Sequence, residues 1–424
     1  MTTLGANFWR LWTSSSLSNV ADGILKVVLP LVAVGLTDSP TLIAGLALAL
    51  TLPWLLFALP AGALSDRWDR RRTMVVANVV RAVLMLALAA CFAADVTSIW
   101  MLYVVAFAVG STETFYDTSA QSILPQLVPR AVLPRANSRL FGAELIANQF
   151  VGPPLGGFLV VAGAVVSFAV PAAAWFAAVG VLLLVGGRYR VERDVATTMR
   201  ADVAEGLSFL WHNGLLRLLA IMVGSFNFLS SAAWSILVLY AVGPGSAMGL
   251  SEPGYGVLLA VVAVGSLLGS LIVEDAERLL GRFWCLTAAS LAMAALVGAP
   301  AVTTSVPWIA AAVFVGGVGL ALWNVITVSL RQRVTPDRLL GRVNSAYRLV
   351  AWGTMPLGSL AGGLLAEWLG LRPVFAVTGI LSVVAVVALM LPLRAHLRRL
   401  EETDAAPSDD GAGPLMSVSH SETL

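Results

Sequence analysis

Twelve long apolar segments, separated by clusters of charged and turn-forming residues, limit most strongly how this chain can fold. They cover approximately residues 8–36, 40–64, 73–94, 98–123, 137–162, 164–187, 214–242, 254–274, 282–302, 306–330, 341–367 and 370–393. A helix needs about 20 apolar residues to cross a bilayer. Only 12% of the 424 residues are charged, whereas an average soluble domain has about a quarter. This excludes a soluble enzyme, a nucleic-acid-binding protein and a disordered scaffold, and predicts an all-α membrane protein with twelve transmembrane helices.

The arginines predict the orientation of these helices in the membrane. They gather in alternate loops and after the last apolar segment, around residues 67–72, 130–135, 188–200, 278–282, 331–338 and 394–399. The opposite loops carry one basic residue, Arg372. Because loops rich in Lys and Arg stay in the cytoplasm, we expect both termini there and a multi-pass protein of the cell membrane.

The chain also contains an internal repeat. An offset of 207 residues aligns Gly110 with Gly317, Tyr116 with Trp323 and Asp117 with Asn324. Both halves begin on the same side, so the repeats are parallel, which is the arrangement of major facilitator transporters. We expect six-helix halves at 1–187 and 214–393, a cytoplasmic linker at 188–213 and a disordered cytoplasmic tail at 394–424. In the linker, helical spacing of Val203, Leu207, Leu210 and Trp211 predicts an amphipathic helix on the membrane surface.

The loop between the second and third segments contains a charged motif, Gly62-Ala-Leu-Ser-Asp66-Arg67-Trp-Asp-Arg70-Arg71-Arg72. It resembles the loop signature of the major facilitator superfamily, with Asp69 where that pattern usually has glycine. The resemblance implies a lock in which Asp66 binds arginines or caps a neighbouring helix and holds the two halves in one conformation. We place Gly62, Asp66, Arg67, Arg70, Arg71 and Asp117 in this lock. The alternative is an anchor for the positive side of the membrane combined with a helix cap.

The fifth segment contains Gly152-Pro153-Pro154-Leu155-Gly156-Gly157. It resembles the signature of drug:proton antiporters in that superfamily, and two further stretches resemble its macrolide-efflux and enterobactin-exporter branch, Leu124–Ser138 and Val334–Ser345. Small residues let helices approach closely, and an internal proline removes a backbone hydrogen bond. Gly152, Pro153, Gly156 and Gly157 are therefore expected to form a pivot and seal between the halves, although close packing alone explains the same residues.

Seven charged residues fall inside the expected helices and away from the helix ends: Asp22, Lys26, Arg81, Glu113, Asp117, Glu144 and Arg348. Each costs about 2.5–3.5 kcal/mol at the bilayer centre on insertion scales, so each needs a partner or water. Asp22, Lys26 and Glu113 are the candidates for proton coupling. Asp22 and Lys26 are four residues apart in the favourable order for a helical ion pair, and a lysine, unlike arginine, can lose its proton. Purely structural pairing is the alternative.

Polar and aromatic residues inside the helices are candidates for lining a substrate cavity: Asn19, Tyr116, Asn148, Asn227, Trp323 and Asn324, with Gln149, Trp234 and Tyr347 in addition. Such residues also serve as interhelical contacts or interfacial anchors. As a group they favour a roomy site for an amphipathic organic molecule.

The resemblance implies a secondary transporter that exports a drug, natural product or siderophore by proton antiport and alternating access. Its partners would be a small-molecule substrate, protons and the lipid bilayer, with no nucleic acid, cofactor or metal, and it would act as a monomer. The alternatives are an uptake symporter, an uncoupled facilitator, or a membrane receptor or enzyme on this scaffold. The chain has no HExxH, GxSxG or nucleotide-binding loop, and we expect it not to be an enzyme.

Overall fold

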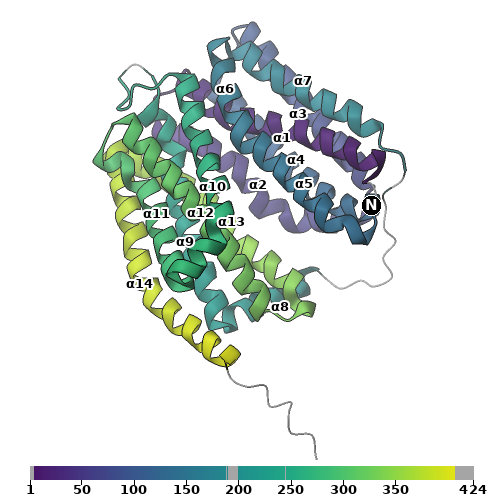
Figure 1. The fold of residues 1–424 in the computed structure, drawn as a ribbon. Helices are drawn as coiled ribbons and strands as arrows, with labels where there is room; N and C mark the ends of the chain where they lie inside the picture. Colours follow the sequence, from purple (N-terminus) through teal and green to yellow (C-terminus); the bar gives the residue numbers. More distant parts are fainter. Residues whose placement is uncertain (1–3, 188, 190–198, 244, 406–424) are drawn as a thin grey trace, which may run out of the picture.

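The computed structural model describes residues 4–187, 189, 199–243 and 245–405, except for the side chains of residues 58–59, 62–67, 199–203, 337, 401 and 403–405. Nearly all of this part is helical (Figure 1). The elements are α1 (Gly5–Val34), α2 (Pro40–Arg67), α3 (Arg70–Ala93), α4 (Ile99–Leu127), η1 (Arg130–Val132), α5 (Leu133–Leu145), η2 (Ile146–Val151), α6 (Gly152–Val161), α7 (Ala164–Leu183), α8 (Met199–His212), α9 (Gly214–Ala241), α10 (Glu252–Leu280), α11 (Arg282–Val302), α12 (Val306–Val334), α13 (Asp337–Leu369) and α14 (Leu371–Ala405).

The helices form two bundles, α1–α7 and α9–α14, which lie side by side in Figure 1. In the first bundle α1 packs on α6 and α7, and α4 packs on α2 and α3. The second repeats the pattern, with α9 on α13 and α14, and α12 on α10 and α11. The bundles meet along two helix pairs, α2 with α13 and α6 with α10.

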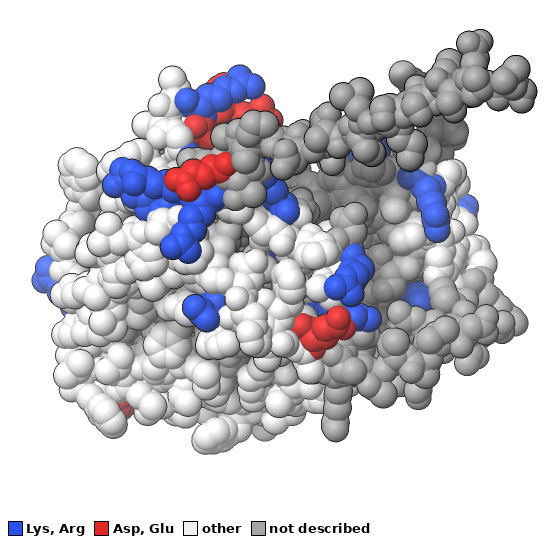
Figure 2. Space-filling view, turned by 90° about the horizontal axis from the view of Figure 1, so that it is seen from below, with Lys and Arg blue, Asp and Glu red and all other residues white. Residues whose placement is uncertain are grey.

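The apolar core is shared between the halves at one end and divided at the other. One cluster joins α1, α2, α3, α4 and α7 to α9, α10, α11, α12, α13 and α14. A second cluster belongs to the C-terminal half together with α8, and a third to the N-terminal half. The third includes residues beside the arginine-rich loops, such as Met74, Val128 and Leu182. The halves therefore share one core at the end opposite those loops, and each has a core of its own at the arginine-rich end. Figure 2 shows the molecule from the arginine-rich end.

Eleven helices in the described part are long and apolar enough to cross a membrane. The expected fifth crossing, 137–162, is not among them because it is divided into three short consecutive elements. These are α5, the π-helix η2 and α6. Pro153 has no N–H, so the regular helical bond to the preceding turn cannot form. Gly152 N–H instead donates to Ala147 O, five residues back.

One boundary and the surroundings of the linker helix differ from the sequence prediction. The expected tail began at residue 394, but α14 continues to Ala405, because Leu393 and Leu397, four residues apart, are both buried in the core of the C-terminal half. The linker helix α8 also packs on protein: Leu210 is fully buried, and Glu205 forms an ion pair with Arg342 of α13. Leu207 and Trp211 remain exposed, and the side chain of Val203 lies outside the description.

Candidate functional site

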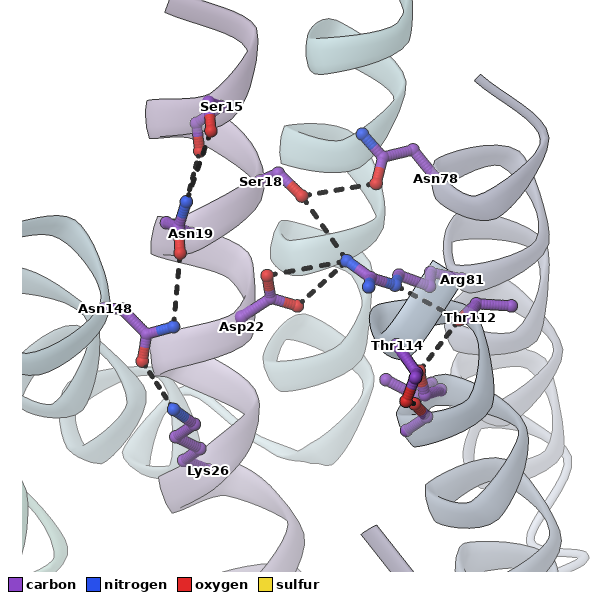
Figure 3. A network of polar contacts seen from close by, with 12 residues as sticks. Ser15, Ser18, Asn19, Asp22, Lys26, Asn78, Arg81, Thr112, Thr114 and Asn148 are labelled. Carbon is purple, nitrogen blue, oxygen red and sulfur yellow. Dashed lines mark hydrogen bonds and ion pairs between the residues drawn. The ribbon is translucent and has the colours of Figure 1, made fainter. Parts of the chain in front are cut away.

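A buried ion pair occupies the interior of the N-terminal half (Figure 3). Arg81 Nη1 of α3 lies 3.2 Å from Asp22 Oδ1 of α1. Arg81 is fully buried and Asp22 is 7% exposed. The pair expected from the sequence, Asp22 with Lys26, is not formed. Asp22 pairs with Arg81 of α3 instead, because the side chain of Arg81 is buried beside the carboxylate, whereas Lys26 is exposed.

Polar and aromatic side chains complete the surroundings of Arg81. Its Nε donates to Thr112 Oγ1 at 3.1 Å, and Ser18 Oγ lies 3.4 Å from its Nη1. The guanidinium carbon lies 5.2 Å from the ring centre of Tyr116 and 5.7 Å from that of Trp175, within the range of cation–π attraction. These contacts enclose the guanidinium, although its Nη2 has no hydrogen-bond partner among the described residues.

Lys26 belongs to a second chain of hydrogen bonds, also drawn in Figure 3. Its Nζ donates to Asn148 Oδ1 at 2.7 Å, Asn148 Nδ2 donates to Asn19 Oδ1 at 3.3 Å, and Asn19 Nδ2 donates to Ser15 O at 2.9 Å. Asn148 lies in η2, and π-helical turns are often found at functional sites. The wider turn brings an amide from the fifth crossing onto α1, where Lys26 is exposed.

The remaining acids lie around this pair and form with it the charge cluster of the N-terminal half. Asp117 is close enough to Asp22, Arg81 and Glu113 for their charges to act on its carboxylate. Its predicted role in the loop lock stays a prediction, since the side chains of Asp66 and Arg67 lie outside the described residues. Glu144 is close enough to Lys26 and Glu113 to interact with them in the same way.

One charge reaches this cluster from the other half. Arg348 of α13 acts electrostatically on both Asp117 and Glu144. It is exposed, and its guanidinium carbon lies 4.3 Å from the ring centre of Trp352. Lys26, Glu144 and Arg348 are all exposed although their positions fall within the apolar segments.

The other residues predicted to line a substrate cavity differ in exposure and in the contacts they make. Tyr116 is 1% exposed beneath Arg81, so it packs inside the half. Asn227 Nδ2 donates to Ala351 O at 2.7 Å and thus ties α9 to α13. Asn324 is exposed on α12. Trp323 is 3% exposed and lines a cavity within the C-terminal half.

Two arginines of the charged loop donate to backbone carbonyls. Arg71 donates to Leu182 O at 3.2 Å and to Leu183 O at 2.8 Å, and Arg70 donates to Tyr189 O at 3.1 Å. Asp69 caps α3 by accepting from Arg72 N, and also accepts from Tyr189 N. The side chains of Asp66 and Arg67, like Gly62, lie outside the description, so the lock stays a prediction.

The small-residue motif lies where α6 contacts both halves. A Cβ on Gly152 would stand 2.6 Å from Gly23 Cα, and one on Gly156 would stand 2.8 Å from Ile24 O, both on α1. A Cβ on Gly157 would stand 2.8 Å from Pro253 Cα of α10, in the other half. Pro153 itself packs against Gly256 of α10. No side chain larger than hydrogen fits at these three glycines without moving a backbone.

A contact between the halves that the sequence did not indicate lies at the end opposite the arginine-rich loops. Glu367 Oε2, on α13, accepts from Ser39 Oγ at 3.1 Å, Thr41 Oγ1 at 3.2 Å and Thr41 N at 3.4 Å. A carboxylate at the first turn of α2 is favoured by the helix dipole. Within the described residues, all hydrogen bonds between the two bundles join residues 39–41 to residues 363–367.

A family described as "Transmembrane secretion effector" (MFS_3) matches residues 4–423. The chain belongs to the major facilitator superfamily. This family consists of membrane transporters and not enzymes, and it confirms the all-α major facilitator fold predicted from the sequence.

Relatives and solved structures agree with this assignment over almost the full length. The "Multidrug efflux pump Tap" of Mycolicibacterium fortuitum is 28% identical over 408 residues, covering 92% of this chain and 95% of that protein. An uncharacterized MFS-type transporter, YfiS of Bacillus subtilis, is 26% identical, covering 88% of this chain and 90% of that protein. The crystal structure of the nucleoside transporter NupG matches with a TM-score of 0.73 at 14% identity, covering 92% of this chain and 99% of that one.

Proposed function

We propose that this protein exports a small amphipathic organic molecule by proton antiport, through alternating access of one central site to the two sides of the membrane. The observation that carries the proposal is the division of the apolar core. The halves share one cluster at the end closed by Glu367 and have separate clusters at the arginine-rich end. A transporter caught open to one side has this arrangement.

The open side is the cytoplasm in this proposal, because loops rich in arginine stay on that side. Both termini then lie in the cytoplasm, and the structure corresponds to an inward-facing state. The exposure of Lys26, Glu144 and Arg348 supports a water-filled cavity between the halves, since charges at membrane depth face a cavity or the bundle interior. One chain supplies both walls of this cavity, so we propose that it works as a monomer.

Proton coupling is assigned to the charge cluster of the N-terminal half, with Asp22 as the proton carrier and Glu113 as its neighbour. In the inward-facing state Asp22 is paired with Arg81. Protonation of Asp22 would remove the charge that holds Arg81 and free the helices α1 and α3 to move relative to each other. Lys26 and Asn148 link the same helix α1 to the fifth crossing, so such a movement can reach the small-residue contacts of α6.

Export is favoured over uptake by two observations. The small-residue motif of α6 resembles that of antiporters, and its close packing on α10 of the other half supports a seal at this interface. The Tap relatives are named multidrug efflux pumps, and the similarity covers nearly the whole chain.

The charge cluster favours substrates that are neutral or cationic, because its acidic residues outnumber its basic ones. The acids are Asp22, Glu113, Asp117 and Glu144, and the basic residues are Lys26, Arg81 and Arg348.

The deciding experiment is efflux from cells. The chain is expressed in a bacterial host that lacks its own drug pumps, the cells are loaded with ethidium, and efflux is followed with and without a protonophore. We expect faster efflux that the protonophore abolishes. Uptake that requires a proton gradient would instead support a symporter, and protonophore-insensitive equilibration would support an uncoupled facilitator.

A further inference from the structure

Two tryptophans from different halves meet where α2 packs on α13. The ring centres of Trp54 and Trp352 lie 4.8 Å apart, and the ring planes cross at 88°. One residue further along each helix, a Cβ on Gly353 would stand 3.2 Å from Leu55 Cδ1. The contact of these two helices at the closed end includes Gly363, about 15 Å further along α13 at a rise of about 1.5 Å per residue. The two tryptophans therefore lie deep within the span, on the arginine-rich side of the closed end.

An arginine covers one face of the Trp352 ring. The guanidinium carbon of Arg348 lies 4.3 Å from the ring centre, within the range of cation–π attraction. Side chains of a helix cover the turn that precedes their own Cα, and α13 begins beside the arginine-rich loops. The ring of Trp352 is therefore directed toward the arginine-rich end, and 37% of the residue is exposed although Arg348 lies on it.

The covered ring face borders the space between the halves. Arg348 is exposed, and it lies within electrostatic reach of Asp117 on α4 and Glu144 on α5. Both acids belong to the N-terminal half, so the guanidinium lies between the halves. A charge at membrane depth faces the bundle interior or a water-filled cavity and not the lipid. A cation that enters from the arginine-rich end, where the halves have separate cores, can therefore approach the same ring.

These surroundings suit a planar organic cation. Two aromatic rings at a right angle form a corner, and aromatic surfaces of this kind bind quaternary ammonium and methylated amino groups. The acids of the charge cluster outnumber its basic residues, so one more positive charge is balanced there. Arg348 itself has the planar, delocalised and weakly hydrated charge of such a ligand. The chain thus already holds a cation of the expected chemistry on the Trp352 ring.

We propose that Arg348 is a tethered placeholder on Trp352, and that the transported molecule is a planar aromatic cation that takes its place on the ring. The displaced guanidinium moves to the carboxylates of Asp117 and Glu144, which compensate it for leaving the ring. Two cations cannot share one ring face, because they repel each other strongly where water screens them poorly. Substrate and Arg348 therefore compete. This inference rests on the proposed function and names the substrate class within it.

N-Methylacridinium and acridine are matched probes for this site. Both are planar and consist of three fused rings, but the first is permanently charged and the second is uncharged in mildly alkaline buffer. Binding of each probe to the purified protein in lipid nanodiscs is titrated by fluorescence, and empty nanodiscs give the background. We expect saturable binding of N-methylacridinium. Its absence from both the wild type and Arg348→Met would overturn the proposal.

Arg348→Met removes the placeholder and keeps an unbranched side chain. We expect N-methylacridinium to bind about three- to tenfold tighter to this variant, the range of a cation–π contact that becomes available. Acridine should gain less, because an uncharged ring is not attracted in this way. A gain of affinity is diagnostic, since a variant with a distorted site loses affinity instead. Unchanged or weaker binding of N-methylacridinium would refute the competition.

Removal of a positive charge attracts any cation, so the ring is tested together with the arginine. Trp352→Leu should weaken binding of N-methylacridinium to Arg348→Met about three- to tenfold, and in the Trp352→Leu background the gain from Arg348→Met should shrink. An equal gain with and without Trp352 would show that net charge alone acts, and would overturn the assignment to the ring. Trp308→Leu is the matched control, because Trp308 is 72% exposed on α12, and both affinities should stay unchanged.

These affinities are measured without a gradient, so they can succeed or fail separately from export. Efflux of N-methylacridinium from the pump-deficient host then joins the ring to transport. Trp352→Leu should raise the concentration that gives half-maximal efflux by a factor similar to the loss of affinity, and Trp308→Leu should not. Efflux that is independent of Trp352 would overturn the assignment to substrate. Ring-dependent binding without efflux by any variant would support the cation site and contradict the proposed export.

Discussion

Replacement of Asp22 by Asn tests the central ion pair most directly. At 3.2 Å and an effective dielectric constant near 20, the attraction between the two charges is about 5 kcal/mol before desolvation is counted. Removing one partner of a buried pair costs about 3–5 kcal/mol, because the other charge stays buried without compensation. The amide still accepts a hydrogen bond from Arg81, so we expect a loss near 3 kcal/mol.

The measurement has two parts. Thermal unfolding of the purified protein in detergent reports stability, and proteoliposomes report transport driven by a pH gradient and exchange of substrate without one. Asp22→Asn should unfold at a lower temperature, should lose pH-driven transport and should keep exchange. Exchange matters because it shows that the variant still binds substrate and still alternates.

The double variant Asp22→Asn with Arg81→Met separates the two roles of the pair. Removing both charges restores much of the stability, since the uncompensated charge is gone. If Asp22 carries protons, pH-driven transport stays lost in the double variant. Full recovery of pH-driven transport would refute the coupling role and leave the pair purely structural. Lys26→Met in place of Arg81→Met serves as the control, and it should not restore stability because Lys26 is bonded to Asn148.

Three further substitutions test the gates. Glu367→Gln should weaken the closed end by about 1–2 kcal/mol, because an uncharged amide oxygen accepts more weakly from Thr41 than the carboxylate does. Cysteine labelling from the external side should increase, and unchanged labelling would exclude a gating role. Gly156→Leu should abolish export or cause a proton leak, because its Cβ would stand 2.8 Å from Ile24 O, whereas Gly142→Leu, with nothing within 4 Å, should be silent. Asp66→Asn should leave membrane insertion intact, shift the inward/outward ratio and stop most transport, and a variant with normal transport and ratio would rule out the loop lock.

The sequence predicted the fold well because membrane proteins obey strong one-dimensional rules. Apolar segments of spanning length and the internal repeat were sufficient to predict the helices and the fold class. The small-residue motif could likewise be read directly, since glycines at Gly152, Gly156 and Gly157 have few explanations other than close helix contact. The end of α14 was missed because the three arginines after residue 393 and the acidic residues that follow them are typical of a polar tail, although Leu393 and Leu397 share one buried face.

The details of the site were harder because they depend on tertiary contacts. The spacing of Asp22 and Lys26 suggested a pair, yet a spacing of four residues says only that two side chains share a helix face. The partner that Asp22 binds depends on the side chains of the neighbouring helices, and α3 places Arg81 inside the bundle. Glu367 offered no signal, since a single acid near a helix end is common on any protein surface.

The two halves, although built on one repeat, have diverged into different chemistry. Of the seven charges that lie away from the ends of the predicted spans, six are in the N-terminal half, and Arg348 is the one from the C-terminal half. At equivalent positions, one half holds Arg81 between Tyr116 and Trp175, and the other holds an apolar cavity beside Trp323. A proton carrier needs charged partners whose balance changes on protonation, whereas a site for organic molecules needs few buried charges to desolvate. In the mechanism proposed above, this division lets protonation of Asp22 move α1 while the C-terminal half holds the substrate, and Arg348 of the C-terminal half lies within electrostatic reach of Asp117 and Glu144.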